Sequence, residues 1–146
     1  MPAPADRQDA SPGSAVAVSA GVLVSDGRVL VCQRRADQPH ASKWEFPGGK
    51  RDGGETMEEC LRRELREELD IEADVGVELW RTDFTYPGRP PVALTFFRVD
   101  AYRGAIVNRV FATMRWVSID DLPHLDFLEA DRAFITRLVQ RDIRVA

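Results

Sequence analysis

The chain has 146 residues and a mass of 16.4 kDa, which suits one domain with a sizeable hydrophobic core. Its 44% hydrophobic and 30% charged residues exclude the disordered class, and no apolar run approaches the ~20 residues that span a bilayer. A net charge of −4 disfavours DNA or long RNA as a stable partner, because proteins that bind polyanions usually carry a basic face.

Residues 1–14 are rich in Pro, Ala, Asp and Ser and lack the apolar stretch of a signal peptide, so we predict a disordered N-terminal tail. No linker or repeat divides residues 15–146, which we expect to form one domain. The two cysteines, Cys32 and Cys60, lie in a strand-like and a helix-like run, where each is expected to be a small buried side chain rather than half of a disulfide. This cysteine usage favours a reducing, cytoplasmic setting.

The first expected elements are two strand-like runs, residues 15–24 and 27–32, joined by the short turn Ser25-Asp26-Gly27. An Asp-Gly turn between apolar runs is typical of a β-hairpin. A short strand is expected at 44–46, and the four glycines of residues 47–55 predict an irregular loop.

The clearest helix begins after Thr56 and ends near Leu69. Thr56 and Glu59 have the spacing of a capping box, in which the threonine hydroxyl and the glutamate each accept a hydrogen bond from an exposed backbone N–H. Leu61 and Leu65 continue a stripe toward Leu69 that should dock on a sheet.

The second half of the chain carries further strands and a second helix. The expected elements are strands at residues 71–86, 91–102 and 110–117, a turn at 121–123 and a helix at 131–141. This mixed order of elements predicts an α+β fold, a mixed sheet covered by two helices.

The first helix also carries the residues that point to chemistry. At about 100° per residue, Glu64, Glu67 and Glu68 fall within roughly 100° of one helix face. These like charges repel one another, and a divalent cation such as Mg²⁺, which prefers hard oxygen ligands, would remove the repulsion. The alternative is that the run is simply a solvated helix face.

The segment before the helix favours the functional interpretation. Gly48, Gly49 and Lys50 lie between a strand and a capped helix, and glycine there allows the backbone to approach a metal or a phosphate closely. Arg63 lies four residues before Glu67 and is placed to pair with it and orient it.

These residues carry a family resemblance. Gly49 is followed after five residues by Glu55 and after seven more by Arg63-Glu64-Leu65-Arg66-Glu67-Glu68. The pattern resembles the Nudix box, G-x5-E-x7-R-E-U-x-E-E-x-G-U, where U is a large aliphatic residue, and Ile71 occupies the last position. The flanking segment QRRADQPHASKWEFPGGK resembles the MutT-like branch, which extends the likeness over most of the chain. The resemblance implies the Nudix fold, a mixed β-sheet sandwiched between α-helices.

The resemblance further implies hydrolysis of a nucleoside triphosphate to a nucleoside monophosphate and pyrophosphate. Mg²⁺ would be the cofactor, with Mn²⁺ able to substitute. Glu67 and Glu68 would ligate the metal, Glu64 would be a ligand or the general base, and Glu55 would anchor the loop. By the same likeness, the carbonyl of Gly48 and the side chain of Lys50 would face the metal and the phosphates.

The resemblance also implies a nucleotide pocket lined by Arg35, His40, Glu45 and Phe46, with Phe46 as a stacking surface for the base. An aromatic residue at this point is otherwise simply part of the core. Asp131 would read the edge of the base, or it would be the N-cap of the last helix, or it would do both.

Two positions depart from the family pattern. Asp70 stands where the box has Gly; because aspartate tolerates a left-handed backbone, we expect a small cost in stability and little loss of activity. Residues 104–110 contain no Asp or Glu, although several family members supply an acidic residue from this loop. Asp100 is a candidate substitute.

Several alternatives remain open at this point. The substrate could be an oxidised purine such as 8-oxo-dGTP, a cytidine nucleotide such as CTP or 5-methyl-dCTP, ADP-ribose or an RNA 5′ end. A non-catalytic nucleotide sensor would usually lose the box acids, which are intact here. An oxidised-guanine reader attached to a DNA glycosylase would need a basic face and a partner domain. We expect a small nucleotide as partner, no stable nucleic-acid or membrane partner, and a monomer or a homodimer.

Overall fold

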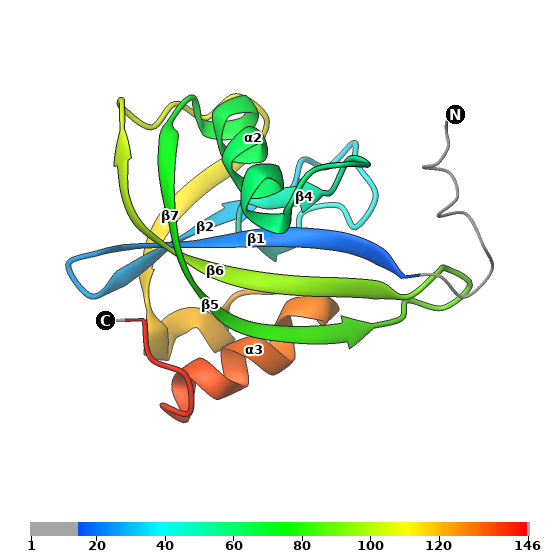
Figure 1. Cartoon of the computed structure of the whole chain (residues 1–146). Helices are drawn as coiled ribbons and strands as arrows, with labels where there is room; N and C mark the ends of the chain where they lie inside the picture. Colours follow the sequence, from blue (N-terminus) through cyan, green and yellow to red (C-terminus); the bar gives the residue numbers. More distant parts are fainter. Residues whose placement is uncertain (1–14, 146) are drawn as a thin grey trace.

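The computed structural model describes residues 15–145 and contains one mixed sheet with a helix on each side (Figure 1). The tail predicted for residues 1–14 lies outside the described residues. The elements in chain order are β1 (Val16–Ser25), β2 (Arg28–Gln33), β3 (Trp44–Glu45), β4 (Gly48–Lys50), α2 (Met57–Leu69), β5 (Glu72–Phe84), β6 (Val92–Arg103), β7 (Thr113–Ser118), the 3₁₀ helix η1 (Ile119–His124) and α3 (Glu129–Val139).

Strand β1 is the centre of the sheet. The strand order is β3-β2-β1-β6-β5, while β4 pairs with β1 and β7 pairs with β2. Only the β1–β6 ladder is parallel, with Val16 opposite Val92, and the other ladders among the described residues are antiparallel. The mixed sheet predicted from the sequence is therefore confirmed.

The hairpin turn is also confirmed. Asp26 and Gly27 both have positive φ angles, 51° and 73°, and Val24 lies opposite Val29. A two-residue turn with both residues in the left-handed region matches the twist of the strands it joins, which explains why Asp-Gly occurs here.

Both faces of the sheet are buried, because successive side chains of a strand point to opposite faces. On β6, Phe96 belongs to the core cluster beneath α3, whereas Phe97 belongs to the cluster beneath α2. The helices supply the other halves of these clusters: Leu61, Leu65 and Leu69 from α2, and Phe134, Ile135 and Leu138 from α3. The α+β sandwich of helix, sheet and helix is thus as expected (Figure 1).

Three expected elements were wrong. Residues 47–55 are not wholly irregular, because Gly48–Lys50 pairs with β1 as strand β4. The turn expected at 121–123 is part of the 3₁₀ helix η1, which contains Pro123. The last helix begins at Glu129 with Leu128 as N-cap, so Asp131 lies inside it and does not cap it.

The early start of α3 has a structural cause. The N–H of Leu128 donates to the carbonyl of Trp44, and the N–H of Trp44 donates to the carbonyl of Asp126, both at 2.9 Å. This pairing with β3 fixes the chain up to Leu128, and the helix begins directly afterwards. Within residues 15–145, no helix is long and apolar enough to cross a bilayer.

Candidate active site

Helix α2 is fixed at both ends by its own sequence. At its start, Glu59 N–H donates to the Thr56 hydroxyl at 3.0 Å, and Thr56 N–H donates to the Glu59 carboxylate at 2.8 Å, so the predicted capping box is present. At its end, Asp70 adopts the left-handed conformation, with φ 61° and ψ 36°. The aspartate therefore takes the backbone geometry for which the box has a glycine.

The three box carboxylates differ in exposure. Glu67 is exposed, Glu64 has only 16% of its side chain exposed, and Glu68 is partly buried. The N–H of Gly48 donates to Glu68 Oε1 at 3.1 Å. Burial, followed by the charge of Glu64, raises the pKa of Glu68 well above its usual range, and burial also raises the pKa of Glu64.

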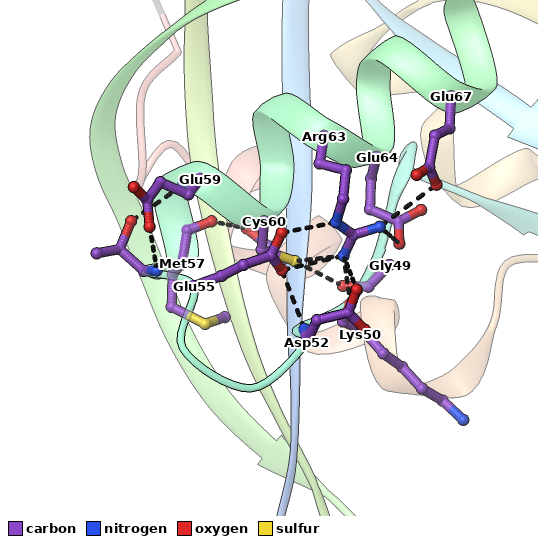
Figure 2. Close-up of polar contacts among 12 residues, drawn as sticks. Gly49, Lys50, Asp52, Glu55, Met57, Glu59, Cys60, Arg63, Glu64 and Glu67 are labelled. Atoms are coloured by element: carbon purple, nitrogen blue, oxygen red, sulfur yellow. Dashed lines mark hydrogen bonds and ion pairs between the residues drawn. The ribbon is translucent and has the colours of Figure 1, made fainter. Parts of the chain in front are cut away.

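Arg63 ties the helix to the preceding loop (Figure 2). Its guanidinium forms two bonds to the Glu55 carboxylate, at 2.6 and 3.1 Å, and donates to the carbonyl of Lys50 at 3.1 Å. The same group reaches Glu64 at 3.0 Å and Glu67 at 3.3 Å. This bidentate pairing lowers the pKa of Glu55. Glu55 also accepts a hydrogen bond from the N–H of Asp52 at 3.0 Å, so it anchors the loop.

The two glycines of β4 are required by close contacts. A Cβ atom on Gly49 would lie 2.5 Å from the carboxyl carbon of Glu64, and a Cβ on Gly48 would collide with the carbonyl of Ser19. Gly48 also has a φ of 149°, which a side chain would strain. The glycines therefore bring the backbone of β4 against the carboxylates of α2.

The donor set fits a divalent cation, although it is not gathered into a metal cage. Within residues 15–145, no three His, Cys, Asp or Glu side chains converge as a ready metal site. Instead, Arg63 holds the carboxylates of Glu64 and Glu67, and Gly48 holds that of Glu68. The oxygen donors are the hard type that Mg²⁺ prefers, and a cation would offset the cost of burying two neighbouring acids.

These carboxylates line a cleft of about 480 Å³ whose lining also includes Ala130 and Asp131 of α3. Because α2 and α3 pack on opposite faces of the sheet, we call the part lined by α2 and β4 one end of the cleft and the part lined by α3 the other. Its wall at this end includes Gly49, Lys50, Val110 and Phe111. The side chain of Lys50 points away from the Arg63 cluster (Figure 2). A cleft of this size can take a small organic phosphate.

The other end of the cleft contains a second acidic group. Asp131 is 4% exposed and Glu45 is paired with Arg34 at 3.2 Å. Burial raises the pKa of Glu45 to about 7 and the pKa of Asp131 well above its usual range, and the charge of Glu45 adds to the shift of Asp131. Tyr86 lines this end, and its hydroxyl oxygen accepts a hydrogen bond from the N–H of Ala130 at 3.1 Å.

The predicted pocket residues are only partly brought together. The cleft is lined by Glu45, Phe46, Lys50 and Asp131. Arg35 does not line it and instead pairs with exposed Asp37 at 2.7 Å. Its neighbour Arg34 lines the cleft instead, because strand β2 ends at Gln33 and the chain then turns.

The two predicted ring-bearing residues of the pocket, Phe46 and His40, have different outcomes. Phe46 lines the cleft as predicted, but its ring is only 3% exposed and packs against Phe96, Phe127 and Phe134, so most of it belongs to the core. His40 lies against the ring of Tyr86, with centroids 4.6 Å apart, and is not part of the cleft wall.

Sequence reasoning missed Arg34 and Tyr86. Tyr86 directly precedes the turn between β5 and β6, and no local pattern shows that this turn reaches α3. Asp100, a candidate for the missing loop acid, pairs with Arg98 at 2.6 Å and does not line the cleft.

Comparisons with known proteins agree with this geometry. The NUDIX domain model matches residues 14–138. The 8-oxo-dGTP diphosphatase of Haemophilus influenzae is 36% identical over 126 residues, which is 85% of this chain and 91% of that protein. The CTP pyrophosphohydrolase of Escherichia coli is 33% identical over 116 residues, 80% of this chain and 85% of that protein.

A solved structure is similar as well. The MutT NUDIX hydrolase from Burkholderia pseudomallei superposes with a TM-score of 0.75 at 26% identity, covering 84% of this chain and 97% of that one. The family match, the two relatives and the carboxylate helix beneath a glycine strand all agree. The chain therefore belongs to the NUDIX family and is an enzyme that hydrolyses phosphorus-containing anhydrides.

Proposed function

We propose that this enzyme hydrolyses a nucleoside triphosphate in a Mg²⁺-dependent reaction that yields a nucleoside monophosphate and pyrophosphate. The observation that carries the proposal is the position of Glu64, Glu67 and Glu68 at one end of a cleft whose other end holds Asp131. A nucleotide has the matching polarity, with an anionic phosphate chain at one end and a hydrogen-bonding base at the other. Relatives named as 8-oxo-dGTP and CTP hydrolases support this substrate class.

Nudix hydrolases generally need a divalent metal, and we assign Mg²⁺ here. Glu67, Glu68 and the carbonyl of Gly48 would hold it, and Glu64 would be a further ligand or the general base. When bound, Mg²⁺ supplies charge neutralisation on the phosphoryl oxygens and acidifies water. Lys50, on the wall of the cleft beside these groups, would neutralise a further phosphate oxygen.

The protein groups then divide the remaining tasks. Water attacks a phosphorus of the triphosphate chain, the new P–O bond forms, and the bond to the departing pyrophosphate oxygen breaks. Glu64 is the residue proposed to accept the proton of that water if it is not a ligand. Arg63 is a positioning residue, because its guanidinium holds Glu64, Glu67 and the loop acid Glu55 together.

The base end favours an oxidised purine among the candidate substrates. Burial raises the pKa of Asp131 well above its usual range and so favours the protonated carboxyl, which offers one donor and one acceptor side by side. 8-Oxoguanine presents the O6 acceptor beside an N7–H donor, which complements such a group. Guanine presents two acceptors there, so one of them would face the carbonyl oxygen of Asp131 without a partner.

The test is a pyrophosphate-release screen with Mg²⁺ over ordinary, oxidised and methylated nucleoside triphosphates, with ADP-ribose and capped RNA included. We expect release from nucleoside triphosphates, with 8-oxo-dGTP preferred over dGTP. Turnover of ADP-ribose or capped RNA alone would overturn the substrate class. Tight nucleotide binding without any turnover would instead indicate a sensor.

A further inference from the structure

The departure of the chain from its family box at Asp70 lies at the left-handed end of helix α2. Asp70 has φ 61°, a conformation that costs an aspartate free energy which a glycine would not lose. Its carboxylate lies 3.2 Å from the guanidinium of Arg109, which belongs to the loop between β6 and β7. The residue that replaces glycine thus gains a contact that glycine cannot make.

The same loop completes the hydrogen bonding of the catalytic helix. The last four carbonyls of a helix lack partners within the helix. Here the N–H of Arg109 donates to the Glu68 carbonyl at 3.0 Å, and the N–H of Val107 donates to the Leu69 carbonyl at 2.9 Å. The last turn of α2, which carries Glu67 and Glu68, is therefore held by the loop.

The loop itself is internally braced and continues into the cleft. Asn108 accepts a hydrogen bond from the N–H of Phe111 at 2.8 Å and donates to its carbonyl at 2.9 Å. Val110 and Phe111 form part of the cleft wall. A shift of the loop would therefore move the wall and release the last helical turn together.

We infer that the Asp70–Arg109 pair is a positioning device that holds the 104–111 loop on the end of α2 and so fixes Glu67 and Glu68. The pair replaces the glycine cap with a contact between two distant segments. Without it, the last turn would fray as helix ends commonly do. The consequence for catalysis rests on the proposed function, whereas the coupling of loop to helix does not.

The first test measures amide hydrogen exchange at positions 107 and 109 in Asp70→Asn, Arg109→Gln and the double variant. Asparagine keeps the left-handed backbone, so Asp70→Asn removes only the charge. Because exposed ion pairs are weak, we expect each single variant to lower the protection factors by up to about fivefold, and the double variant to lower them no further. Arg109→Lys should retain most of the protection.

The chain offers a matched control at the same helix end. Arg66 pairs with Glu72 at 2.8 Å, with both side chains about half exposed, and neither belongs to the 104–111 loop. Glu72→Gln should leave the protection at 107 and 109 unchanged. Equal loss in Glu72→Gln, unchanged protection in the Asp70 and Arg109 variants, or additive losses in the double variant would each overturn the inference.

The Asp70→Gly variant distinguishes the role of residue 70 as a left-handed helix cap from its role in the ion pair with Arg109. If Asp70 were only a cap, glycine would relieve the backbone strain and alter nothing else. We expect instead that the melting temperature holds or rises while amide protection falls. The Mg²⁺ concentration for half-maximal activity should rise by up to about the same fivefold in Asp70→Gly and in Arg109→Gln. A wild-type protein without activity would defeat the proposed function but leave the exchange result intact.

Discussion

At one end of the cleft, Glu64, Glu67 and Glu68 come from a single helix, whereas at the other end Glu45, Tyr86 and Asp131 come from a strand, a loop and a second helix. The first set is ordered by helical spacing, by Arg63, which contacts Glu64 and Glu67, and by the N–H of Gly48, which donates to Glu68. The second set depends on how a short strand, a turn and a distant helix meet. The difference indicates that the phosphate chemistry is specified locally, while base preference depends on tertiary packing.

The largest effect is expected at the end of the cleft that contains the α2 carboxylates. Glu68→Gln keeps the shape of the side chain but removes its charge, so turnover should fall by about a thousandfold while the melting temperature is retained. The measurement is kcat together with thermal unfolding followed by circular dichroism. Glu58→Gln, at an exposed position in the first turn of the same helix, should behave as wild type. Near-normal turnover in Glu68→Gln would remove Glu68 from the metal site.

A second substitution tests whether β4 shapes that end. In Gly49→Ala the new Cβ would lie 2.5 Å from the Glu64 carboxyl carbon, and this flexible carboxylate must move. We expect kcat to fall by about a hundredfold with little change in stability, because small displacements of catalytic groups are costly. Gly53→Ala is the control, since nothing lies within 4 Å of its Cβ position. Equal activity in the two variants would contradict the close packing of β4 on Glu64.

The smallest expected effect concerns the end of the cleft that contains Glu45 and Asp131, and it is measured as the pH dependence of stability. Burial raises the pKa of Glu45 from 4.5 to about 7, so between these values the folded protein holds a proton that the unfolded chain releases. The contribution of Glu45 to stability is therefore complete below pH 4.5 and is lost as the pH rises toward 7.

Glu45→Gln should remove this dependence. Between pH 5 and pH 8 the wild type should lose about 2 kcal/mol of unfolding free energy relative to the variant, with Arg34, Asp131 and Glu68 as the ionisable neighbours in both proteins. The measurement is urea unfolding across that range in the presence of a chelator. Glu129→Gln, at an exposed position, should follow the wild type. Parallel pH curves for wild type and Glu45→Gln would mean that Glu45 is ionised throughout.

Features that depend on neighbours in sequence were predictable. The Asp-Gly turn, the capping box of Thr56 and Glu59, and the left-handed cap at Asp70 all follow from local backbone chemistry, and each is confirmed. The position of the three glutamates on one face of α2 follows from helical periodicity in the same way.

Features that depend on contacts between segments distant in the sequence could not be predicted from the sequence. The strand at Gly48–Lys50 exists because β1 lies beside it, and glycine-rich sequence alone indicates a loop. The prediction that Asp131 caps the last helix was wrong, because the pairing of Leu128 with Trp44 makes the helix begin earlier, at Glu129. The choice between Arg34 and Arg35 depends on where β2 ends, which shifts the side chain by one residue and therefore to the opposite direction.

The parallel ladder between β1 and β6 has a consequence for the order in which the protein matures. Val16 meets Val92 only after the intervening hairpin, helix and β5 have been synthesised, and contacts so distant in sequence form slowly. Helix α2 leaves the ribosome before the sheet that supports it is complete. The carboxylates of α2 are therefore positioned only after β6 has paired with β1. Catalytic activity should accordingly appear late in folding, well after the helix itself can form.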